Sequence, residues 1–284
     1  MSIFRTRIHL KALLGYRLRF ALLWIRNGFR AETVLFYPEY PHNKTMLFKI
    51  CRQCGFNITT NLDRSCDLAF AWENTTWRDE YPELNAIAVQ QRVLNVRCRD
   101  ISKSHLGEVF GRVFGYPLSI DPTTHEGNCV KKSDRNSNKS GEIVLCPIEE
   151  PEDGSVYQRL VRNDHEDGLV EEFRVPVFDG RIPMVFVKHK ASEDRFRTNW
   201  LDVTVKESVD VFTDEEIGKI GEFCREYALD YGEIDILRDS EDGRIYIVDA
   251  NNTPWGPPRH LSEQESRNIV HRQSDFFSRT FMGR

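Results

Sequence analysis

The sequence lacks the short motifs that mark several large enzyme classes. It contains no GxxxxGK[ST], GxGxxG, GxSxG or HExxH pattern, and its scattered histidines have no partner at metal-ligand spacing. P-loop, Rossmann and helix-borne zinc chemistry are therefore disfavoured. A serine-histidine-aspartate arrangement stays open, because its members can lie far apart in the chain, but no pattern indicates one.

Cysteines and long apolar runs are also scarce. The cysteines number 7 in 284 residues, which is an odd count, too sparse for a disulfide scaffold and typical of a reducing compartment. Cys51 and Cys54 form a CxxC without a second pair to complete a zinc site, so we expect buried thiols. The longest apolar run, Phe20–Ile25, is far shorter than the roughly 20 residues that a bilayer span needs. We therefore predict a cytoplasmic protein.

Acidic residues are absent from the start of the chain. Residues 1–30 interleave apolar side chains with the bases Arg5, Arg7, Lys11, Arg17, Arg19, Arg26 and Arg30. Arg17 and Arg19 interrupt the apolar region, so a signal peptide fits poorly. We predict a basic amphipathic helical segment over residues 1–31. Such a helix packs on its own domain, on a partner chain or, as a peripheral anchor, on an anionic membrane, and the sequence leaves these alternatives open.

Positive charge is in deficit over the whole chain. The net charge of −5 provides no strongly basic field to attract a nucleic acid, so we expect no nucleic-acid partner. The apolar and charged fractions are those of an ordinary globular protein. The length allows one large domain or two to three small ones, and a homodimer is compatible with the sequence.

Strand and helix patterns alternate in the first third of the chain. Residues 33–41 read as a buried strand, a helix follows at 43–54, and strands follow near 56–60 and 67–72. This alternation predicts a small parallel sheet. Ligands bind outside the carboxyl ends of such strands. Glu73 and Asn74, just beyond the last strand, are either substrate contacts or ordinary turn residues.

The most informative stretch lies near the carboxyl end. Two strand-like runs, 233–238 and 244–249, flank a polar turn and predict a hairpin. In that hairpin Asp235 falls near Asp249, and Asn251 leaves the same face as Asp249. Two carboxylates and an amide oxygen suit Mg²⁺. The alternative is a strand that ends in a plain polar turn.

Two further patterns lie upstream of this hairpin. Residues 171–177 and 182–189 predict another hairpin, which carries Arg174 and Lys188 either toward an anionic ligand or on a solvated face. Thr213 begins a capping box, and apolar residues at helical spacing follow it, so a helix should lead into the late hairpin.

The late stretch resembles the metal-binding core of the ATP-grasp superfamily. Members place an acidic residue in one strand and an acidic-x-Asn pair after the next, often before a proline, as in Asp235, Asp249, Asn251 and Pro254. The resemblance implies that Asp235, Asp249 and Asn251 hold Mg²⁺ ions that bridge the phosphates of ATP. Family members more often have glutamate at the position of Asp249, which is shorter by one methylene.

Other segments resemble the family in the expected order. The resemblance implies nucleotide contacts for Lys103, Lys132, Lys139, Gln158, Leu160 and Val161. Lys132 would bind phosphate, with Lys131 in reserve on the opposite strand face. Gln158 and the backbone after it would contact adenine. Arg174 and Lys188 would be the catalytic residues, whose positive charges bind phosphate or an acyl phosphate.

The resemblance also implies the architecture and the reaction. We expect an α/β protein with α+β lobes, in which a small α/β domain (32–103) precedes an ATP-grasp fold with antiparallel sheets (104–284). The implied activity is an ATP- and Mg²⁺-dependent ligase, which activates a small-molecule carboxylate as an acyl phosphate for attack by an amine or a thiol. A small-molecule kinase and a non-catalytic nucleotide-binding module are the alternatives.

Overall fold

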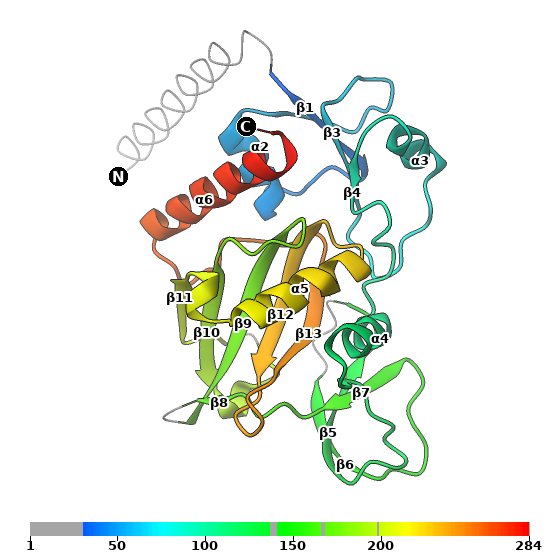
Figure 1. Cartoon of the computed structure of the whole chain (residues 1–284), viewed down its shortest axis with the longest axis vertical. Coiled ribbons are helices and arrows are strands. Elements are labelled where there is room, and N and C mark those ends of the chain that lie inside the picture. The colour runs from blue at the N-terminus through cyan, green and yellow to red at the C-terminus, as the bar shows by residue number, and fades with distance from the viewer. Residues whose placement is uncertain (1–30, 137–140, 166–167, 198, 284) are drawn as a thin grey trace, which may run out of the picture.

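The structure is a computed structural model that describes residues 31–136, 141–165, 168–197 and 199–283 (Figure 1). Residues 1–30 of the predicted amphipathic segment and Lys139 lie outside the described residues. Among the residues that are described, no helix combines the length and apolarity needed to cross a membrane.

A small parallel sheet begins the fold. Its order is β2-β1-β3-β4, all parallel, and helices connect its first strand to its second and its third to its fourth, which confirms the predicted parallel sheet. The elements are β1 (Thr33–Pro38), α2 (Met46–Cys54), β2 (Asn57–Thr59), β3 (Leu68–Trp72), α3 (Pro82–Ala88) and β4 (Val93–Leu94). β3 is buried at every position because it is a central strand that is covered on both faces. Thr45 caps the start of α2, and Gly55 ends that helix in the left-handed conformation.

A larger antiparallel sheet forms the centre of the molecule. Its order is β11-β10-β9-β12-β13, with β8 paired to β9, and both predicted hairpins are confirmed within it. The elements are β8 (Asp164–His165), β9 (Leu169–Phe178), β10 (Val185–Ala191), η2 (Ser192–Asp194), β11 (Asp202–Lys206), η3 (Ser208–Asp210), β12 (Tyr231–Arg238) and β13 (Ile245–Asn251).

Two helices cover one face of this sheet. The predicted capping box at Thr213 begins α5 (Asp214–Glu226), whose buried side chains pack on β9 and β12. Beside it lies α4 (Lys103–Phe114), where Phe110 stacks on Tyr246 of β13 at 5.8 Å between ring centroids. These two helices leave the opposite face of the large sheet uncovered, so a functional site would lie on that face.

That opposite face changes character along its length. Phe178, Phe186 and Tyr231 form an apolar end, which packs against the first sheet and against α6 (Glu263–Phe281). Helix α6 thus returns to the N-terminal unit, where the ring of Phe277 stacks on Phe70 with centroids 6.2 Å apart (Figure 1). Beyond the apolar end the same face carries charged side chains.

A third sheet completes the fold as a separate lobe (Figure 1). Its antiparallel order is β6-β5-β7, formed by β5 (Gly127–Ser133), β6 (Glu142–Cys146) and β7 (Ser155–Arg159). The ion pair between Arg159 and the fully buried Asp239, at 3.2 Å, ties this lobe to the turn between β12 and β13. Mixed α/β structure with antiparallel lobes is the predicted fold class, whereas the predicted domain boundaries stay a prediction.

Candidate functional site

The β12–β13 hairpin brings the predicted metal ligands together. Its register pairs Asp235 with Asp249 and Glu233 with Asn251, and a bulge follows Asp235. A buried oxygen of Asp249, Oδ1, accepts no hydrogen bond from the part of the chain that the structure describes. Burial raises the pKa of Asp249, and the neighbouring charge of Asp235 adds to this, while Lys103 and Lys132 oppose it.

Arg174 is joined directly to this pair of carboxylates. It lies opposite Asp235 in the β9–β12 register, and its Nε and Nη2 donate to the two oxygens of Asp235 at 2.8 and 2.9 Å. Burial alone would raise the pKa of Asp235, but Arg174 and Lys188 outweigh it and hold that pKa below its usual range. Arg174 and Asp235, predicted for two different roles, thus form one bidentate ion pair.

Sequence reasoning missed a third carboxylate in the same place. Glu233 is 6% exposed, and its Oε2 lies 3.8 Å from Nε of Arg174. Burial raises the pKa of Glu233 to about 7, against the pull of Arg174 and Lys188. The signal was available, because a residue two positions before Asp235 in a strand shares its face.

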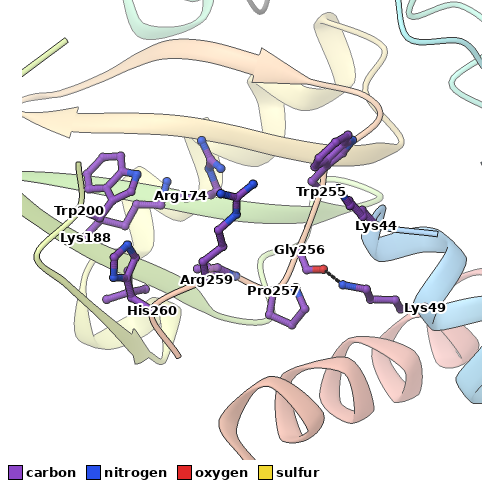
Figure 2. Close-up of a pocket in the computed structure, with 12 residues that line it drawn as sticks. Lys44, Lys49, Arg174, Lys188, Trp200, Trp255, Gly256, Pro257, Arg259 and His260 are labelled. Carbon is purple, nitrogen blue, oxygen red and sulfur yellow. Dashed lines mark hydrogen bonds between the residues drawn. The ribbon is translucent and has the colours of Figure 1, made fainter. Parts of the chain in front are cut away.

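Lys188 lies on the neighbouring strand of the same face. Its ammonium group donates to Glu172 at 3.2 Å and lies 4.4 Å from the ring centre of Trp200. Lys190 lies at 4.3 Å from the same ring and 3.8 Å from Glu172. Lys188 is therefore held in place by one carboxylate and covered by an aromatic ring, close to Arg174 (Figure 2).

The three-stranded lobe contributes Lys132 and Gln158. Nζ of Lys132 donates to Oε1 of Gln158 at 2.9 Å, whereas Lys131 turns to the other face and pairs with Glu142 and Glu152. Burial lowers the pKa of Lys132 to about 8, and Asp249 partly restores it. Nε2 of the buried Gln158 has no hydrogen-bond partner among the described residues.

Lys103 reaches the site from the start of α4. Its Nζ lies 3.6 Å from Oδ1 of Asp249 and donates to the carbonyl of Arg135 at 3.2 Å. Ser102 caps the helix, accepting from the amide of His105 at 3.3 Å, so capping and a site contact coexist in adjacent residues. Lys103 of α4 and Lys132 of β5 thus both place a positive charge near the carboxylate of Asp249.

Leu160 and Val161 directly follow β7. The side chain of Val161 is buried in the core, and its carbonyl accepts from Nη1 of Arg195 at 3.1 Å. Leu160 is half-buried. Their predicted contact with adenine stays a prediction. Of the residues beyond β3, Asn74 accepts from the hydroxyl of Thr253 at 3.3 Å, which places it beside the metal motif.

No protein-family model matches the sequence, and no curated protein matches it. Solved structures do match. The chain aligns over 89% of its length with 98% of the ATP-grasp ligase PsnB complexed with a phosphomimetic variant of its minimal precursor, Mg and ADP, at a TM-score of 0.55 and 12% identity. It aligns over 89% of its length with 98% of the D-alanine–D-alanine ligase from Bacillus anthracis complexed with ATP, at a TM-score of 0.51 and 13% identity. The chain has the ATP-grasp fold.

The oxygen ligands on this ATP-grasp hairpin fit a divalent cation. Oδ1 of Asp249 is buried, accepts no hydrogen bond within the described ranges and lies 3.6 Å from Nζ of Lys103, so its lone pairs are available to a cation. Asp235 accepts two bonds from Arg174, and an ionised carboxylate has about four acceptor positions, so it retains capacity. Oδ1 of Asn251 accepts from the amide of Thr253 at 2.9 Å, and the Thr253 hydroxyl lies 3.4 Å from it. That hydroxyl lies similarly close to Oδ1 of Asn74, at 3.3 Å, and its single proton can serve only one of the two oxygens, so the second lone pair of Asn251 is open when Asn74 accepts it.

The ATP-grasp sheet also carries a cavity that the sequence did not indicate. It measures about 670 Å³, and Arg174 and Lys188 are among its lining residues (Figure 2). Trp200 and the segment after β13 close other sides. Arg174 and Lys188 therefore line a space of small-molecule size and are at the same time paired with Asp235 and Glu172.

Proposed function

We propose that this protein is an ATP- and Mg²⁺-dependent ligase, which activates a substrate carboxylate as an acyl phosphate for attack by an amine or a related nucleophile. The observation that carries the proposal is the convergence of Asp249 and Asp235 with bases from three elements, namely Lys103, Lys132 and Arg174. Carboxylates for a cation beside bases for phosphate are what phosphoryl transfer requires. The ligases that share the fold support the same reading.

ATP would lie between the three-stranded lobe and the large sheet. The free Nε2 of Gln158 would donate to the adenine base, while Lys132 and Lys103 would bind phosphate oxygens. Mg²⁺, held by Asp235, Asp249 and Asn251, would neutralise charge on the phosphates. Burial lowers the pKa of Lys132, and the negative charge of a bound phosphate would raise it again. We therefore expect Lys132 to bind ATP in its charged form.

The chemistry needs no covalent protein nucleophile. A carboxylate oxygen of the substrate attacks the γ-phosphorus, the bond to the β–γ bridging oxygen breaks, and ADP leaves with the electron pair. The amine then attacks the carbonyl carbon of the acyl phosphate, inorganic phosphate leaves, and the amine loses a proton to solvent. Arg174 and Lys188 would hold the carboxylate and stabilise the charge that builds up on the transferred group.

A trapping assay tests this proposal. The purified chain is incubated with Mg-ATP, hydroxylamine and a panel of small-molecule and peptide carboxylates, since PsnB is complexed with a precursor. A ligase gives ADP, free phosphate and a hydroxamate. A phosphorylated product that resists hydroxylamine would instead indicate a kinase. Binding of Mg-ATP without turnover on any acceptor would favour the non-catalytic module.

A further inference from the structure

The cavity beside the site has walls from three parts of the chain. Its floor is the charged face of the large sheet, with Arg174 and Lys188, which we call the sheet bases. The other walls are the start of α2 and the segment from Trp255 to His260. These walls contribute Lys44, Lys49 and Arg259, which we call the wall bases (Figure 2).

Backbone hydrogen bonds join the two segments that carry the wall bases. The amide of Met46 donates to the carbonyl of Pro254 at 2.9 Å, and the amide of Gly256 donates to the carbonyl of Lys44 at 3.2 Å. The ammonium group of Lys49 donates to the carbonyl of Gly256, and that of Lys44 lies 5.3 Å from the ring centre of Trp255. The two walls are thus fixed to each other, and the bases are oriented by contacts that leave their charge uncompensated.

The balance of charge in the cavity is one-sided. Every ionisable side chain among its described lining residues is basic, although the chain as a whole has a net charge of −5. The sheet bases are neutralised by Asp235 and Glu172. Within residues 31–136, 141–165, 168–197 and 199–283, the wall bases have no ion-pair partner. A cleft lined by one sign of charge attracts ligands of the opposite sign.

The basic residues of the cavity fall into two groups by position. The sheet bases adjoin the metal-ligand carboxylates, so a group bound there lies where phosphoryl transfer would occur. The wall bases stand on the segments that form the other walls. Trp255, which is 51% exposed, and Trp200 add apolar surface to the lining.

We propose that the cavity is the acceptor site and that it takes a small molecule with at least two anionic groups: the carboxylate that is activated at the sheet bases, and a second carboxylate or a phosphate bound by the wall bases. This inference rests on the proposed function. The cavity volume of about 670 Å³ falls within the range of roughly 300–1,000 Å³ that is typical of small-molecule sites. The second group is what distinguishes this acceptor from a simple monocarboxylate.

Calorimetry on the full chain, with Mg-ADP present, tests the proposal. The probes are butyrate, glutarate, tricarballylate, 3-phosphoglycerate and a glutamate hexapeptide, which differ in charge number, in the kind of second anion and in size. We expect at least one small dianion or trianion to bind about tenfold or more tightly than butyrate, because a charge-assisted contact contributes that much. In Arg259→Gln and Lys44→Gln this preference should fall several-fold.

The control variant is Arg267→Gln, which removes a similar charge from the exposed face of α6 and should keep the preference. Equal binding of butyrate and all polyanions, or a preference unchanged in Arg259→Gln, would overturn the proposal. Binding of the hexapeptide alone would also overturn it, since the acceptor would then be an acidic peptide. Hydroxamate formed equally well from monocarboxylates would leave the ligase intact and remove the second anion site. Polyanion binding without any hydroxamate would support the anion site and count against the ligase.

Discussion

The sheet bases and the wall bases line one cavity but are held in different ways. Arg174 and Lys188 stand on adjacent strands and are each paired with a carboxylate. Lys44 and Arg259 stand on connecting segments and have no acidic partner within the described part of the chain. The comparison teaches that the paired bases are pre-organised by the fold, whereas the charge of the unpaired bases remains available to a ligand.

Removing Arg174 should have the largest effect on stability. Arg174→Gln leaves Asp235 and Glu233 without their partner, at 14% and 6% exposure. We expect a loss of about 2 kcal/mol in the free energy of unfolding, which is less than for a fully buried pair because Arg174 is 35% exposed. Urea unfolding measures this, and the double variant Arg174→Gln/Asp235→Asn should recover part of the loss. An unchanged midpoint in the single variant would contradict the pairing.

Removing the carboxylate of Asp249 should affect Mg-ATP binding more than stability. Asp249→Asn should weaken Mg-ATP binding about tenfold to a hundredfold, because the buried oxygen would no longer carry a charge for the cation. Calorimetry with and without Mg²⁺ measures this. Asp210→Asn, at an exposed position, is the matched control and should bind like wild type. Equal weakening in both variants would indicate a general charge effect.

Lys132 sharpens the comparison because it stands on a strand, yet its ammonium group donates to the amide oxygen of Gln158, at 2.9 Å. Its pKa of about 8, lowered by burial, means that it is charged below that pH and neutral above it. Affinity for Mg-ATP should therefore fall about tenfold as the pH rises from about 7 to about 9. Lys132→Arg stays charged and should flatten this dependence. A profile that is the same in both proteins would exclude Lys132 as its origin.

Arg259 should give the smallest change in stability. It has no ion-pair partner within the described ranges, so we expect Arg259→Gln to alter the free energy of unfolding by less than about 0.5 kcal/mol. Urea unfolding beside Arg174→Gln compares the two classes of base directly. A loss as large as that of Arg174→Gln would mean that the wall bases are structural as well, and the distinction would disappear.

The hairpins and caps could be predicted because their signals are local. Turn residues between β-branched runs fixed the β12–β13 pairing, and strand alternation correctly put Asp235 beside Asp249 and separated Lys131 from Lys132. The pairing of Arg174 with Asp235 could not be predicted, because it depends on which strand lies beside β12 and in what register.

The cavity was equally inaccessible to sequence reasoning. Lys49 and the carbonyl of Gly256 that accepts its hydrogen bond are 207 positions apart, and no periodic pattern links them. Lys44 and Trp255, which meet at the cavity, are likewise more than 200 positions apart and share no pattern in the sequence. The roles of the site residues themselves remain predictions, which the experiments above would test.

The course of the chain after β13 has a mechanical consequence. The segment that leaves the metal motif forms a wall of the cavity, is clamped to the start of α2, and then continues into α6, which packs on the N-terminal sheet. The segment that forms the wall is therefore continuous with the segment that leads into α6. A shift of the N-terminal unit against the large sheet would carry this wall with it, so we expect occupancy of the cavity to respond to the relative position of the two units.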